Sequence, residues 1–147
     1  MDNTAENYHH KIFAGRYDRL AEIGEFIAQA AENAGFDEDA VYTLQLAVDE
    51  ACTNIIEHSY GGEDIGKIQC ICDDDEDELI ITLHDWGKAF DPDNVPEPDF
   101  SVPIEEVESR GAGLMLIKKI MDDVKFKFSP DQGNVLIMVK NKKKGQK

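Results

Sequence analysis

The stretch AVDEACTNIIEHSY, residues 47–60, has the apolar spacing of an amphipathic helix, and an unusual row of polar side chains borders its apolar stripe. Glu50, Asn54 and His58 recur at every fourth position. Because four residues turn an α-helix by only about 40° beyond a full turn, these side chains are expected to form one oblique row. The row is a candidate functional surface. The structural alternative is that Asn54 satisfies a backbone group and His58 favours the helix C-terminus.

Periodic segments around this helix predict an α+β fold. Helical spacing covers 18–35, the segment that follows Asp37 up to about Tyr60, and 111–123, while β-rich composition covers 11–17, 65–73, 78–87, 124–130 and 133–140. The last four strands are expected to form two hairpins. This order is typical of a two-layer α/β sandwich, in which helices cover one face of a mostly antiparallel sheet.

Length and charge restrict the function classes. The chain has 147 residues, which fits one domain, and 15 Lys and Arg against 31 Asp and Glu give a formal net charge of −16. This charge argues against binding nucleic acid through its phosphates and favours a basic protein partner. No apolar run is long enough for a membrane span, and the N-terminus does not resemble a signal peptide, so a cytoplasmic location is expected. The three cysteines are expected to be reduced and packed as small hydrophobic residues.

Two segments stand apart from the periodic core, which spans about 11–140. Residues 88–110 contain four of the five prolines, and an irregular excursion of this length in a small domain is usually functional, often as a lid. Residues 141–147 are rich in lysine and are expected to form a basic C-terminal tail.

Two further clusters carry residues suited to a ligand. Asp85-x-Gly87 follows a β-rich run, where a carboxylate can accept a hydrogen bond from a ligand amino group, although such a motif is also a common turn. Gly111-x-Gly113 opens a helix, where free backbone N–H groups favour an anion. The carboxylate of Glu50 and the amide of Asn54, on the helix that follows Asp37, suit Mg²⁺, which prefers oxygen ligands. Together the three clusters predict a site for Mg²⁺ and ATP.

These clusters resemble the boxes of a known family. Glu50-x-x-x-Asn54, Asp85-x-Gly87 and Gly111-x-Gly113 are similar to the N, G1 and G2 boxes of the GHKL ATPases, which include gyrase, histidine kinases and MutL. EACTNIIEH, the FDP after the G1 box, and RGAGLMLIKKIMDDV look most similar to the bacterial anti-sigma factor serine kinases of the RsbW and SpoIIAB type. The resemblance implies a Bergerat (GHKL) fold for a single domain, residues 1–147.

The resemblance also implies roles for individual residues. Asn54 would bind Mg²⁺, Glu50 would act as the general base on the acceptor hydroxyl, and Arg110 would reach the γ-phosphate from the lid. The nucleotide-binding residues would be Asp85, which accepts from the adenine amino group, with Gly87 beside it, and Gly111 and Gly113 against the phosphates.

Two positions depart from the family pattern. Ala89 stands where the G1 box often has a second glycine, which makes nucleotide affinity less secure. Asn134 follows Gly133 where many relatives have threonine, so one hydroxyl contact is expected to be missing. Neither change removes the expected Mg²⁺ ligand or the expected base.

The function implied by the resemblance is an ATP-dependent serine/threonine protein kinase. It would bind a sigma factor, phosphorylate an anti-sigma factor antagonist, and form a homodimer. One alternative is a nucleotide-binding or degenerate interaction module without phosphoryl transfer. Another is a detached histidine-kinase catalytic domain, although no dimerising helical hairpin surrounds His9 and His10.

Overall fold

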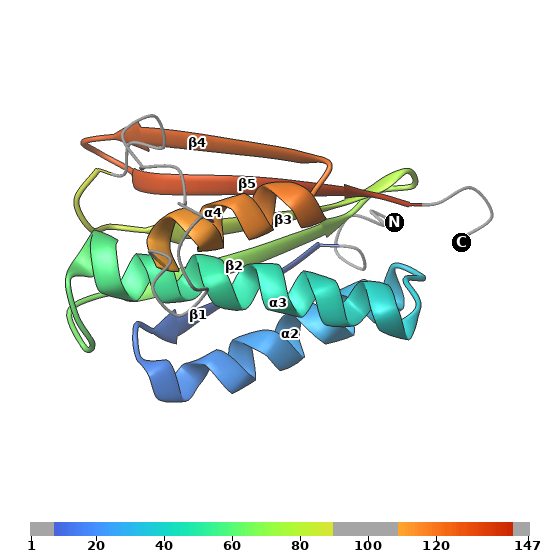
Figure 1. Ribbon diagram of the computed structural model, residues 1–147, viewed down its shortest axis with the longest axis horizontal. Helices are drawn as coiled ribbons and strands as arrows, with labels where there is room; N and C mark the ends of the chain where they lie inside the picture. The colour runs from blue at the N-terminus through green and yellow to red at the C-terminus, as the bar shows by residue number, and fades with distance from the viewer. Residues whose placement is uncertain (1–7, 90–108, 143–147) are drawn as a thin grey trace, which may run out of the picture.

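A five-stranded antiparallel sheet forms one layer of the protein. The computed structural model describes residues 8–89 and 109–142. The strands are β1 (Tyr8–Ala14), β2 (Lys67–Asp74), β3 (Glu78–Asp85), β4 (Asp123–Ser129) and β5 (Gly133–Asn141), in the spatial order β1-β2-β3-β5-β4 (Figure 1). All four strand pairs are antiparallel, with β2–β3 and β4–β5 as hairpins. The expected α+β fold is confirmed.

Three helices form the second layer, on one face of the sheet (Figure 1). They are α2 (Leu20–Asn33), which follows a short 3₁₀ turn, α3 (Glu38–Asn54) and α4 (Ser109–Ile120). Asp37 caps α3 as expected, because its side chain accepts a hydrogen bond from the Ala40 N–H at 2.9 Å. Gly35 ends the preceding helix region with a φ of +95°, a conformation that favours glycine.

The helical segment after Asn54 does not remain an α-helix. Residues Ile55–Tyr60 form a π-helix (η2), which ends at Gly61 with a φ of +80°. A π-helix forms its hydrogen bonds between residues five apart, so its turns are wider than those of an α-helix. This segment carries Ser59, which is buried.

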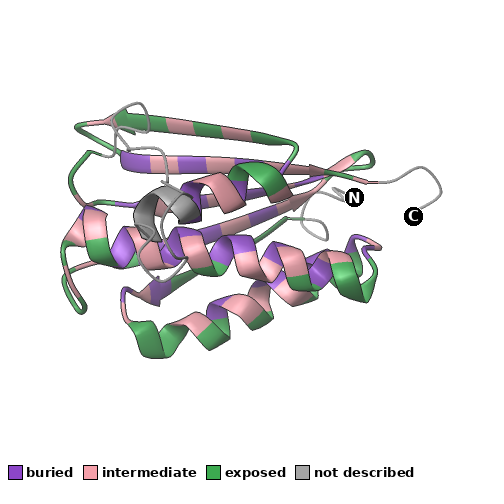
Figure 2. Cartoon of the chain, in the orientation of Figure 1, coloured by how far each residue is buried: buried purple, intermediate pink, exposed green. Residues whose placement is uncertain are grey.

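The core lies between the sheet and the helices. Alternate strand residues point inward, so buried and less buried positions alternate along β2, β3 and β5 (Figure 2). The largest fully buried side chains include Ile23, Ile27, Leu44, Ile56, Ile68, Ile81, Leu83 and Met138. The three cysteines are free thiols and buried in this core, which confirms their expected packing.

Several expected boundaries differ from the observed ones. Strand β1 starts three residues before the expected segment, and α4 starts at Ser109. Of the expected lid, residues 90–108 lie outside the described residues. Of the expected basic tail, Asn141 ends β5 and Lys142 pairs with Asp74, while residues 143–147 also lie outside the described part. None of the helices in the described ranges is long and apolar enough to cross a membrane.

Candidate functional site

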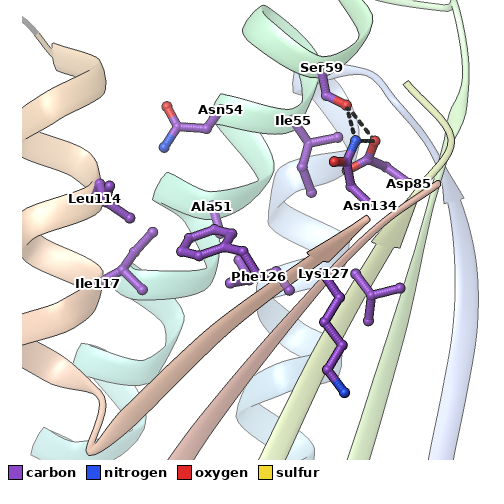
Figure 3. Close-up of a pocket in the computed structure, with 12 residues that line it drawn as sticks. Ala51, Asn54, Ile55, Ser59, Asp85, Leu114, Ile117, Phe126, Lys127 and Asn134 are labelled. Atoms are coloured by element: carbon purple, nitrogen blue, oxygen red, sulfur yellow. Dashed lines mark hydrogen bonds between the residues drawn. The ribbon is translucent and has the colours of Figure 1, made fainter. Parts of the chain in front are cut away.

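A cavity is lined by residues of the helices α3, η2 and α4 and of the strands β3, β4 and β5. Its apolar lining residues are Ala51, Ile55, Leu114, Ile117, Phe126, Val135 and Leu136. Its polar lining residues are Asn54 on α3, Lys127 on β4, and a cluster of Ser59, Asp85 and Asn134 (Figure 3). A mostly apolar pocket with a few convergent polar groups is typical of a small-molecule site. Asn54 and Asp85, 31 positions apart in the sequence, thus line one cavity.

The Asp85 carboxylate is held in a fixed orientation. It ends β3 and is only 3% exposed. Its Oδ1 accepts hydrogen bonds from the Ser59 hydroxyl, from Asn134 Nδ2 at 3.0 Å, and from the Gly87 N–H at 2.9 Å. Within the described part of the chain, no hydrogen bond ends on Asp85 Oδ2. This oxygen is therefore the one suited to accept from a ligand donor.

Gly87 is required by packing within the protein. A Cβ at this position would overlap the backbone carbonyl and the hydroxyl of Ser59. In the structure, the absent side chain lets the turn after β3 lie against η2, so that Gly87 can donate to Asp85.

Glu50 and Asn54 lie one turn apart on α3 and face the start of α4. A Cβ on Gly113 would come within 2.7 Å of Glu50 Oε2 and 3.4 Å of Asn54 Nδ2. Gly113 therefore allows α4 to approach both side chains closely. The structure thus brings three of the expected site residues together.

The electrostatic environment of Glu50 suits a proton acceptor. Burial raises the pKa of its carboxyl group above the ordinary value, and the nearby charges of Asp49 and Glu57 raise it further. A carboxylate with a raised pKa is a stronger base than an ordinary glutamate. The side chain is half-buried, so it remains within reach of a substrate at the surface.

The π-helix carries both His58 and Ser59. Ser59 lines the cavity, whereas His58 is not among its lining residues and lies 3.7 Å from the Glu57 carboxylate. The expected place of His58 in the polar row stays a prediction. Ser59 was not singled out from the sequence, because it belongs to none of the three clusters.

Asn134 makes contacts within the protein that its place in the sequence did not predict. Its amide nitrogen lies 3.0 Å from Ser59 Oγ, 3.0 Å from Asp85 Oδ1 and 2.8 Å from the Lys88 carbonyl oxygen. Its two N–H hydrogens are shared among these three acceptors. The expected loss of a hydroxyl contact at this position stays a prediction.

Two expected site residues are described only in part. Arg110 and Gly111 lie in the first turn of α4, which places them near Gly113 along the chain. The side chain of Arg110 lies outside the described residues. The roles expected for both residues therefore stay predictions.

The polar groups around Asn54 fit Mg²⁺ bound together with a phosphate ligand. Asn54 has a carboxamide oxygen and Glu50 a carboxylate, which are oxygen donors of the kind that Mg²⁺ prefers, and both side chains lie close to Gly113. Among the described residues, no group of three or more His, Cys, Asp or Glu side chains could hold a metal ion. An ion at Asn54 would therefore take most of its ligands from phosphates and water, as Mg²⁺ commonly does.

Comparison with known families agrees with this geometry. Residues 13–140 match the family described as the histidine kinase-like ATPase domain. The match includes all elements that line the cavity. It also includes every expected site residue.

The chain is also similar to curated relatives in sequence and to a solved structure in fold. The chain is 36% identical over 118 residues to the serine-protein kinase RsbW of Bacillus cereus strain AH187, covering 78% of this chain and 72% of the relative. The values are the same for the serine-protein kinase RsbW of Bacillus thuringiensis strain Al Hakam. The catalytic domain of the histidine kinase ThkA, in a nucleotide-free form, is 15% identical, with a TM-score of 0.50 over 91% of this chain and 98% of that one. The last likeness concerns the fold alone.

Proposed function

The chain belongs to the family of histidine kinase-like (GHKL) ATPase domains, and from this we propose that it is an ATP-dependent serine/threonine protein kinase that acts as an anti-sigma factor. Its substrate in this proposal is an anti-sigma factor antagonist, and phosphorylation of the antagonist decides which protein partner is bound. The observation that carries the proposal is the convergence of Asn54 and Asp85 on one cavity, with Glu50 one turn away. The identity to serine-protein kinases named RsbW supports it.

The adenine end of the proposed site lies at Asp85. Asp85 Oδ2 accepts a hydrogen bond from the amino group of the base, and the apolar walls contact the faces of the ring. The phosphates extend toward Asn54 and the first turn of α4, where the backbone N–H groups of a helix start favour an anion.

The transfer end of the proposed site lies at Glu50. Its carboxylate orients the acceptor hydroxyl of the antagonist and accepts the hydroxyl proton. The Asn54 oxygen would hold Mg²⁺, and Arg110 would contact the γ-phosphate. When bound, Mg²⁺ neutralises phosphate charge, which is the main requirement of phosphoryl transfer. The chain itself therefore supplies positioning and one proton acceptor.

Replacement of Glu50, the proposed base, should abolish phosphoryl transfer while ATP binding is retained. Anti-sigma factor antagonists from the organism that carries this chain are incubated with γ-labelled ATP and with wild type or Glu50→Gln. Wild type is expected to label one antagonist with acid-stable phosphate. Glu50→Gln should bind ATP within about twofold of wild type and transfer at least about a hundredfold more slowly. Asp49→Asn, on the preceding residue, is the matched control and should retain transfer.

The same assay distinguishes the alternatives. ATP binding without labelling of any antagonist would support a nucleotide-binding module that lacks transfer. Acid-labile phosphate would instead support a histidine-kinase catalytic domain. Equal rates for wild type and Glu50→Gln would show that Glu50 is not the base.

The proposed assembly state needs its own measurement. The family resemblance suggests a homodimer, and the net charge of −16 makes a basic protein partner plausible. Light scattering coupled to size-exclusion chromatography, at low and at physiological salt, should give twice the chain mass of 16.5 kDa. A mass equal to one chain in both conditions would contradict the homodimer.

A further inference from the structure

We infer that Ser59 and Asn134 are positioning residues, which orient Asp85 so that the site prefers purine nucleotides carrying a 6-amino group. The inference rests on the proposed function, because it concerns the base of the nucleotide. It assigns a role to two buried residues that do not belong to the three sequence boxes. Their side chains converge on Asp85 from η2 and β5 (Figure 3).

The hydrogen bonds around Asp85 fix which carboxylate oxygen is available. Ser59 has one hydroxyl hydrogen, which it donates to Asp85 Oδ1, while its oxygen accepts from Asn134 Nδ2. With Asn134 and the Gly87 N–H, three donors converge on Oδ1. Because these donors surround Oδ1, a ligand donor is directed to Oδ2.

The donors are themselves anchored by the backbone. The Lys88 N–H donates to the Ser59 carbonyl at 2.9 Å, and Asn134 Nδ2 donates to the Lys88 carbonyl at 2.8 Å. Ser59 and Asn134 are each only 8% exposed, so water cannot readily replace either partner. The turn after β3, η2 and the start of β5 are thus tied together around one carboxylate.

This arrangement has a consequence for base selection. The terminal torsion of an aspartate is broad, so a carboxylate without these donors would rotate. With Oδ1 held, Oδ2 presents a pure acceptor in a fixed direction. A 6-amino group donates to it, a purine with hydrogen at this position leaves it unpaired, and a 6-oxo group places two acceptors together. Loss of Ser59 or Asn134 should therefore weaken recognition of the amino group in particular.

The test compares two nucleotides that differ at one position of the base. Calorimetry in Mg²⁺ measures Kd for ATP and for purine riboside 5′-triphosphate, which lacks the 6-amino group, with wild type, Ser59→Ala and Asn134→Leu. Wild type should bind ATP at least about tenfold more tightly than the analogue. Both variants should weaken ATP binding by about fivefold to tenfold and change the analogue by less than about twofold.

A control variant and thermal melting distinguish a positioning role of Ser59 and Asn134 from a merely structural one. Asn33→Leu makes the same change as Asn134→Leu at a position on α2 away from the cavity and should leave both Kd values unchanged. Thermal melting shows whether each variant is folded at the titration temperature, and Ser59→Ala removes the fewest atoms. If both nucleotides weaken in parallel, the two residues are merely structural and the inference is overturned. If wild type binds neither nucleotide, the proposed function itself fails.

Discussion

Burial raises the pKa of Glu50, and this has a consequence for stability as well as for catalysis. A carboxyl group whose pKa is higher in the folded protein is destabilising when ionised. Its contribution to stability is complete below the pKa of the unfolded chain and is lost as the pH rises through the folded pKa. Glu50→Gln should therefore have a higher Tm than wild type at pH 7, and the difference should shrink toward pH 4. Melting curves across this range, with exposed Glu38→Gln as control, provide the measurement. A wild type that melts above Glu50→Gln at pH 7 would contradict the raised pKa.

The pKa of Glu50 should also determine how the rate of phosphoryl transfer depends on pH. A general base acts only when it is deprotonated, so transfer should decline as the pH falls through the pKa of Glu50. Because that pKa is raised, the decline should begin above the range of an ordinary glutamate. Single-turnover transfer between pH 4 and pH 8 measures it. A rate that stays constant down to pH 4 would show that Glu50 is not the general base.

Gly113 offers a substitution that should disturb catalysis more than folding. In Gly113→Ala the new methyl group meets Glu50 Oε2 at 2.7 Å, and the flexible glutamate side chain can move aside. Stability should change little, while transfer should fall by about tenfold or more because the base is displaced. Gly24→Ala, also inside a helix, meets Gln45 Nε2 at 3.6 Å and should raise stability by about 0.5–1 kcal/mol without affecting transfer. Unchanged transfer in Gly113→Ala would show that Glu50 need not keep its position.

Among the elements, an ion pair links the hairpin of β2 and β3 to the residue that follows β5. Lys142 Nζ lies 2.7 Å from Asp74 Oδ1, with side chains only 12% and 19% exposed. Lys142→Ala would leave a largely buried carboxylate without its partner, which should lower the free energy of unfolding by about 1–3 kcal/mol. Urea denaturation measures this, with exposed Lys118→Ala as the control. Equal midpoints for Lys142→Ala and Lys118→Ala would mean that the pair contributes nothing.

The elements were largely predictable because they depend on local pattern. Apolar periodicity located α2 and α3, and Asp37 marked the start of α3. Asn54 and Asp85 were predicted to converge, and they line the same cavity. Ser59 was not predicted, because it lies outside the three clusters and meets Asp85 only through the fold. The partners of Asn134 were not predicted either, because they lie on other elements.

In the whole molecule, three separate sequence clusters contribute to one proposed binding site. They come from α3, from the end of β3 and from the start of α4, and residues of these three elements line the same cavity. The proposed function requires that this cavity binds ATP together with Mg²⁺. The proposed partners and the proposed transfer reaction depend on this binding.

Calorimetric titration with ATP, with and without Mg²⁺, measures this binding. Wild type should bind one ATP per chain, and Mg²⁺ should tighten binding by about tenfold or more. Asn54→Ala should lose most of this Mg²⁺ dependence, whereas Asn33→Ala, on the exposed side of α2, should retain it. Absence of ATP binding by wild type, or a Mg²⁺ effect that is the same in wild type and Asn54→Ala, would contradict the account.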